Sequence, residues 1–163
     1  MSERRHPHVV NVTDVEPRVQ STGKFQAQLK QLGVAAGARQ LGCTWVEVPP
    51  GKTAFPRHFH CVNEEAMFVL SGTGTVRMGE ATIPVGPGDW VSFPTGPDHA
   101  HQVVAGDSEP LRYLGFSTKI PGEVVGYPDS KKIGAMAAGA DGKPYLRFLF
   151  EEGSAVDYWK GEI

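Results

Sequence analysis

Glycine and proline interrupt the apolar segments of this chain at short intervals along most of its length. The 163-residue sequence contains 20 Gly and 13 Pro, and turn-forming runs such as Gly-Pro-Gly-Asp at 86–89 separate short apolar stretches. Glycine supplies positive φ and proline a fixed φ in tight turns, whereas both residues weaken the interior of a helix. This pattern predicts an all-β sandwich or barrel without a long helix.

Alternation of apolar and polar residues places the expected strands between these turns. Phe25, Ala27 and Leu29 alternate with polar neighbours, which is the period-two pattern of a half-buried strand. The predicted strands are 24–30, 41–48, 66–70, 75–78, 81–85, 90–93, 102–104 and 111–116. Residues 131–138 are instead predicted to form one or two helical turns, limited by Gly134 and Gly139.

The length of the chain predicts one domain with a real core and no internal boundary. We expect an N-terminal arm at 1–23, a barrel at 24–120 and a C-terminal extension at 121–163. The extension is rich in aromatic residues between 145 and 159, so we expect it to pack on the barrel or on a second subunit.

Charge and targeting signals exclude several classes of protein. The net charge is -2, from 16 basic and 18 acidic residues without a long run of either sign, which argues against a nucleic-acid or anionic-membrane partner. The first ten residues lack the apolar segment of a signal peptide, and no window approaches the roughly 18 apolar residues of a membrane span. The two cysteines are too few for a disulfide framework. These features predict a cytoplasmic protein.

The stretch 56–72, PRHFHCVNEEAMFVLSG, holds the strongest chemical signal. Pro56 disfavours a helical start, and in an extended strand His58 and His60 point to the same face, whereas on a helix they would diverge. A carboxylate just downstream, Glu64 or Glu65, can join them. Two imidazoles and one carboxylate suit Zn, Mn, Fe, Ni or Cu, with a further ligand expected from a distant strand.

The spacing of this stretch resembles the first motif of the cupin superfamily. A glycine, His-x-His, four residues, Glu, six residues and Gly occur in that order, and this spacing selects Glu65 over Glu64. The gap after Gly51 is one residue longer than usual in the family.

The stretch from Gly88 resembles the second cupin motif, with Pro94, Thr95 and Gly96 followed by a histidine. Counting forward from Gly96 selects His99, whereas counting back from the strand after the motif selects His101, which we favour. The two share a strand face, so either could reach a metal. The similarity covers about residues 40–117. Beyond it, YPDSKK at 127–132 and the ending around DYWKGE at 157–162 resemble a group of small bacterial single-domain cupins of mostly unassigned function.

The resemblance implies an all-β double-stranded β-helix, or jelly-roll, barrel that is commonly dimeric and has extensions at both ends. It also implies one divalent transition metal, such as Zn, Mn, Fe or Ni, held by three histidines and a glutamate. Transferred to this sequence, the ligands are His58, His60, Glu65 and His101.

Three functions are compatible with such a site. The first is a metal-dependent enzyme acting on a small polar or carboxylated metabolite by dioxygenation, decarboxylation or isomerisation. The second is a non-catalytic module that binds or senses a small molecule. The third is a purely structural role, in which the metal only stabilises the barrel. Candidate apolar walls are Trp45, Phe55, Phe59, Met67 and Phe93. Candidate polar contacts to a ligand are Arg57, Glu64, Gln102 and Tyr113.

Overall fold

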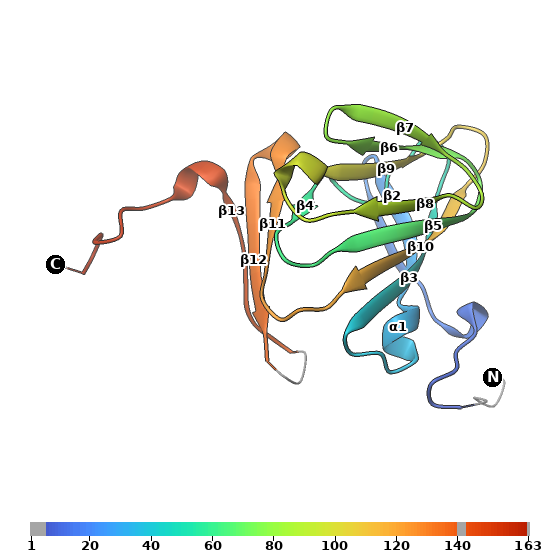
Figure 1. The fold of residues 1–163 in the computed structure, drawn as a ribbon, viewed down its shortest axis with the longest axis horizontal. Coiled ribbons are helices and arrows are strands. Elements are labelled where there is room, and N and C mark those ends of the chain that lie inside the picture. The colour runs from blue at the N-terminus through green and yellow to red at the C-terminus, as the bar shows by residue number, and fades with distance from the viewer. Residues whose placement is uncertain (1–5, 140–142, 163) are drawn as a thin grey trace.

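Antiparallel strands fold around one apolar core in the computed structural model of the protein, which describes residues 6–139 and 143–162 (Figure 1). The strands are β1 (Arg18–Thr22), β2 (Phe25–Lys30), β3 (Leu41–Val48), β4 (Phe59–His60), β5 (Glu65–Ser71), β6 (Gly74–Met78), β7 (Ala81–Val85), β8 (Trp90–Phe93), β9 (His101–Ala105), β10 (Leu111–Thr118), β11 (Glu123–Tyr127), β12 (Lys132–Ala138) and β13 (Pro144–Glu151). The helical elements of the described chain are α1 (Leu32–Ala35), η1 (Val12–Asp14), η2 (Pro97–His99), η3 (Pro128–Ser130) and η4 (Glu152–Ser154).

The described residues form three sheets. A six-stranded sheet has the order β1-β2-β3-β10-β5-β8, and a three-stranded sheet has the order β7-β6-β9. Buried side chains from both sheets form one core, with Val48, Met67, Val69 and Leu111 on the larger sheet and Val76 on the smaller one. The third sheet, β13-β12-β11-β4, joins this barrel through β4 and stands at one end of it (Figure 1).

The strands expected between residues 24 and 118 are present, as β2, β3 and β5 to β10. Strand β5 shows why the alternation was informative, because Met67 and Val69 are buried whereas Phe68 and Leu70 face outward. Residues two apart share a face of a sheet, so an apolar-rich run can cover the core and the outer surface at once. No helix of the described residues is long and apolar enough to cross a membrane.

The prediction of helical turns at 131–138 is wrong, because 132–138 form strand β12. This strand is paired on both sides, with β11 and with β13, and those ladders outweigh a weak helical preference already reduced by Gly134. Within the expected N-terminal arm, Arg18–Thr22 form strand β1, which pairs with β2 at an edge of the large sheet. Beyond β13 the chain runs away from the barrel (Figure 1).

Candidate metal centre

Backbone pairing places two histidines side by side at the end of the barrel near the third sheet. His58 donates its backbone N–H to the carbonyl of His101 at 3.0 Å, and His101 donates to the carbonyl of His58 at 2.8 Å. The two residues therefore form one antiparallel bridge between segments that are distant in sequence. Their rings lie on the same side of this bridge, with centroids 4.6 Å apart.

Two other strands supply the third histidine and the carboxylate. His60 lies on β4, two residues after His58, and pairs with Val125 of β11. Glu65 begins β5, the strand next to the β8 edge of the large sheet, and lies between Phe93 of β8 and Ser117 of β10. Strand pairing on both sides fixes the backbone of Glu65 and therefore the face of the sheet on which its side chain lies.

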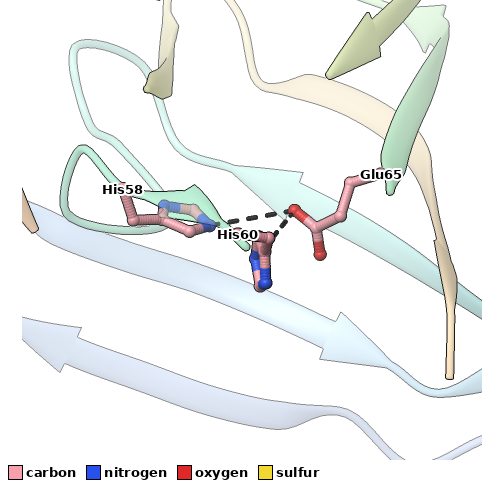
Figure 2. A group of neighbouring side chains, drawn as sticks. All are labelled: His58, His60 and Glu65. Carbon is pink, nitrogen blue, oxygen red and sulfur yellow. Dashed lines mark ion pairs between the residues drawn. The ribbon is translucent and has the colours of Figure 1, made fainter. Parts of the chain in front are cut away.

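The three imidazoles converge on one carboxylate oxygen of Glu65. Glu65 Oε2 lies 3.4 Å from His60 Nε2, 3.4 Å from His101 Nε2 and 3.8 Å from His58 Nε2. Figure 2 shows His58, His60 and Glu65 pointing toward one another, and one ligand atom from each of these three lies within 4.8 Å of the others. The structure thus brings together all four residues singled out as ligands in the sequence.

The remaining ring nitrogen of each histidine faces an acceptor. The Nδ1 atoms lie 2.8 Å from Pro56 O in His58, 3.3 Å from Glu123 Oε2 in His60 and 3.1 Å from His99 O in His101. Because a carbonyl or an ionised carboxylate cannot donate, each Nδ1 carries the hydrogen. In a neutral ring Nε2 then carries an unshared electron pair. This tautomer can bind a metal through Nε2.

The donor set fits a divalent transition metal. Ligand atoms that share a cation at bond lengths of about 2.1 Å lie about 3.0 Å apart at right angles and about 3.4 Å apart at tetrahedral angles. The distances from Glu65 Oε2 to His60 Nε2 and His101 Nε2, 3.4 Å each, equal the tetrahedral value, and the distance to His58 Nε2, 3.8 Å, is 0.4 Å longer. Hydrogen bonds from all three Nε2 atoms to this oxygen would instead require three adjacent cationic rings, which repel one another.

Burial and the two carboxylates set the charge of the centre. Burial alone would raise the pKa of Glu65, but contacts from His101, His58 and His60 hold it far below its ordinary value. Burial alone would lower the pKa of His60, but Glu65 and Glu123 raise it above its ordinary value. Burial lowers the pKa of His101, and the contact with Glu65 only partly offsets this effect. At neutral pH Glu65 is therefore an anion beside a neutral His101.

A cavity of about 330 Å³ opens beside the four side chains and extends into the barrel. All four line it, and its other walls are mostly apolar, including Val46, Met67, Phe93, Phe116 and Val125. The Phe93 ring stacks on His101 with centroids 3.9 Å apart, which fixes the plane of that imidazole. Polar groups on the walls include Arg18, Gln102 and Tyr113.

Several of the residues singled out in the sequence lie on this cavity. Phe55, Met67 and Phe93 are among its walls, as are Gln102 and Tyr113, whereas Trp45 and Phe59 are not. Arg57 instead pairs with Asp129 at 3.4 Å, and Glu64 faces outward next to inward-facing Glu65. His99 contributes its main-chain carbonyl to His101, and in the described chain its imidazole makes no contact with Glu65.

Sequence reasoning missed Glu123, whose carboxylate lies against His60. Glu123 begins β11, outside the stretch that carries the motifs, and its partners lie about sixty positions earlier in the chain. The local sequence shows only an acidic residue before the apolar pair Val124-Val125. This pattern does not indicate which residue the carboxylate contacts.

The family follows from the match of residues 44–116 to the family described as the cupin domain. Over these residues the barrel is a cupin domain. The match spans β3 to β10 and contains all four residues of the candidate centre. Strands β11 to β13, which add Glu123, lie outside it.

Similar proteins match this chain over most of its length. The protein named polyketide synthase CurC from Streptomyces cyaneus is 26% identical over 151 residues, which cover 93% of this chain and 94% of that protein. The solved structure of a cupin-superfamily sugar phosphate isomerase from Silicibacter pomeroyi is 25% identical, with a TM-score of 0.78 and coverage of 92% of this chain and 97% of that one. The polyketide cyclase RemF from Streptomyces resistomycificus is 29% identical, with a TM-score of 0.58 and coverage of 72% and 80%.

Proposed function

We propose that this cupin is a metal-dependent enzyme that acts on a small, oxygen-bearing metabolite at a site formed by His58, His60, Glu65 and His101. The observation that carries the proposal is the convergence of three imidazole Nε2 atoms on one carboxylate oxygen at the wall of a cavity. A metal that only stapled the barrel would not need such a cavity next to it. We also propose that the chain is organised as an N-terminal arm at 1–23, a barrel at 24–120 and a C-terminal extension at 121–163.

A divalent metal at this position would polarise a carbonyl or hydroxyl oxygen and stabilise negative charge on it. The protein supplies the remaining functions. Three neutral imidazoles and one carboxylate leave a net positive charge near the cation, which attracts anionic oxygen atoms. Tyr113 lines the same cavity, and burial and then the charge of Glu65 raise its pKa above the ordinary value. Its hydroxyl therefore keeps its proton and can donate a hydrogen bond to a bound oxygen.

The walls of the cavity favour a ligand with a polar end and an apolar body. The histidines and Glu65 supply polar atoms to the cavity, and Met67, Phe93 and Phe116 supply apolar surface. Among dioxygenation, decarboxylation and isomerisation, we favour a rearrangement of the isomerase or cyclase type. The similarity to a sugar phosphate isomerase and to a polyketide cyclase, at 25% and 29% identity, supports this choice. Carboxylated and keto compounds with an apolar ring are the first substrates to test.

Metal analysis of protein purified without added metal tests the site. We expect about one equivalent of a transition metal in the wild type, largely lost in the variant that combines His58→Ala with Glu65→Gln. His99→Ala is the matched control, because it removes a nearby imidazole but keeps the carbonyl that accepts from His101. Equal metal content in all three proteins would refute the site. Metal and ligand binding without turnover of any substrate would instead indicate a binding module.

We also propose that the chain forms a homodimer through its C-terminal extension. On β13 and beyond, Tyr145, Phe148, Tyr158 and Trp159 are exposed by 76%, 62%, 82% and 59% of their surface. Such a concentration of exposed aromatic residues marks a surface that is covered in the assembled protein. Replacing Tyr158 and Trp159 together by serine should convert a dimer to a monomer in light scattering, whereas Val19→Ser, at a position 66% exposed on β1, should not.

A further inference from the structure

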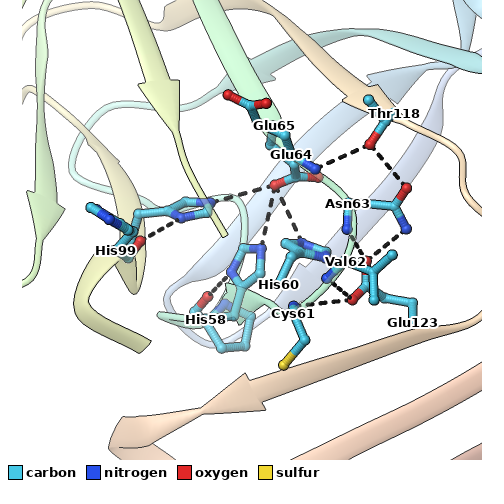
Figure 3. A network of polar contacts seen from close by, with 12 residues as sticks. His58, His60, Cys61, Val62, Asn63, Glu64, Glu65, His99, Thr118 and Glu123 are labelled. Carbon is cyan, nitrogen blue, oxygen red and sulfur yellow. Dashed lines mark hydrogen bonds and ion pairs between the residues drawn. The ribbon is translucent and has the colours of Figure 1, made fainter. Parts of the chain in front are cut away.

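A buried carboxylate outside the four candidate ligands holds the segment that carries His60. Glu123 is only 6% exposed, and its two oxygen atoms accept five N–H groups. Oε1 accepts from the backbone of Cys61 and Val62 at 3.1 Å each and from its neighbour Val124 at 2.9 Å. Oε2 accepts from the backbone of Asn63 at 2.8 Å and from its side-chain amide at 2.7 Å (Figure 3). A single side chain thus fixes the turn between β4 and β5.

The same carboxylate also touches the imidazole of His60. Oε2 lies 3.3 Å from His60 Nδ1, while His60 Nε2 lies 3.4 Å from Glu65 Oε2 on the opposite side of the ring. The other two histidines use neutral main-chain carbonyls for their Nδ1 contacts, namely those of Pro56 and His99. Among the three, His60 is the one whose Nδ1 faces a charged acceptor.

We infer that Glu123 is a positioning residue, which sets the tautomer and the plane of His60 for the metal. This inference rests on the proposed metal site. An ionised carboxylate accepts but cannot donate, so it keeps the hydrogen on Nδ1 and leaves the lone pair of Nε2 toward the cation. Its negative charge also makes the imidazole a stronger ligand. With Glu65, it places a carboxylate on each side of the His60 ring.

The hydrogen bonds explain why a glutamate is required here. Burial alone would raise the pKa of Glu123, but the bonds from Asn63 and Val62 keep it below its ordinary value. An amide at this position has one acceptor oxygen and one donor nitrogen. In either orientation its NH₂ group would face N–H donors, either those of Cys61 and Val62 or those of Asn63 and His60.

Metal affinity separates positioning of the ring from general support of the turn. With Zn²⁺ alone as the probe and a competing chelator, we expect Glu123→Gln to weaken binding by about 10- to 100-fold. Asn63→Ala is the control, because it removes the side-chain bonds of Asn63 with Thr118, Ile120 and Glu123 but keeps the carboxylate that faces His60. It should weaken binding much less. An unchanged affinity in Glu123→Gln, or equal weakening in both variants, would overturn the inference.

Nitrogen NMR of the metal-free wild type reports the tautomer directly and needs no variant. Long-range ¹H–¹⁵N spectra, recorded at a pH where the ring is neutral, should show His60 with its hydrogen on Nδ1. In Glu123→Gln the Nε2–H form should become populated. A wild-type His60 protonated mainly on Nε2 would contradict the inference even if the variant did not fold. A wild type that binds no Zn²⁺ but shows the Nδ1–H form would refute the metal site and leave the positioning contact standing.

Discussion

Replacement of Gly72 by alanine should destabilise the barrel far more than the same change at Gly23. Gly72 lies in the turn between β5 and β6 with φ +78, and an added Cβ would lie 2.3 Å from Pro110 O and 2.9 Å from Leu111 Cα. Both atoms belong to backbone, and Leu111 is fully buried, so neither can move away cheaply. Gly23 also has a left-handed φ, of +57, but no atom lies within 4 Å of its added Cβ.

The structure gives the size of the difference. A left-handed φ costs an alanine about 1–2 kcal/mol at either position. The close contact at Gly72 adds about 1–3 kcal/mol, which is typical of overpacking in a well-packed interior. Gly72→Ala should thus lose about 2–5 kcal/mol of unfolding free energy, out of the roughly 5–15 kcal/mol typical of a domain. Gly23→Ala should lose only about 1–2 kcal/mol.

Urea denaturation followed by far-ultraviolet circular dichroism measures both losses. The slope of free energy against urea concentration should stay constant, so that the shift in midpoint reports stability alone. The entropy that a glycine adds to the unfolded chain is the same in both variants and cancels in the comparison. Equal losses at the two positions would show that the turn before β6 does not approach 110–111 as closely as described, and would refute the reasoning.

Two further predictions concern metal and pH. At a metal concentration of 100 times Kd, metal binding should add about 2.7 kcal/mol to the free energy of unfolding. For a domain of this size this raises Tm by roughly 5–11 °C. A thermal-shift assay should show no such rise in Glu65→Gln. Because burial raises the pKa of Tyr113, its contribution to stability is complete below about pH 10 and is lost as the pH rises above that value. The urea midpoint should therefore fall less between pH 8 and pH 11 in Tyr113→Phe than in the wild type. Equal falls in the two proteins would show that Tyr113 does not cause the loss of stability.

Local patterns predicted much of the barrel. Period-two alternation located β5, because residues such as Met67 and Val69 on one face had to be apolar to reach the core. The same period placed His58 and His60 on one face, since alternate side chains of an extended segment point the same way. It could not predict β12, whose conformation depends on the two strands that pair with it.

The chemistry of the site was visible in the sequence, but its assembly was not. The amino-acid order placed two imidazoles on one face, because a strand has a fixed period. The carboxylate of Glu65 begins another strand, so the turn after β4 brought it to them. The choice between His99 and His101 was left to the tertiary structure, in which His101 exchanges two backbone hydrogen bonds with His58. The role of Glu123 was decided in the same way, because contacts across a sheet depend on strand register, which joins residues far apart in the chain.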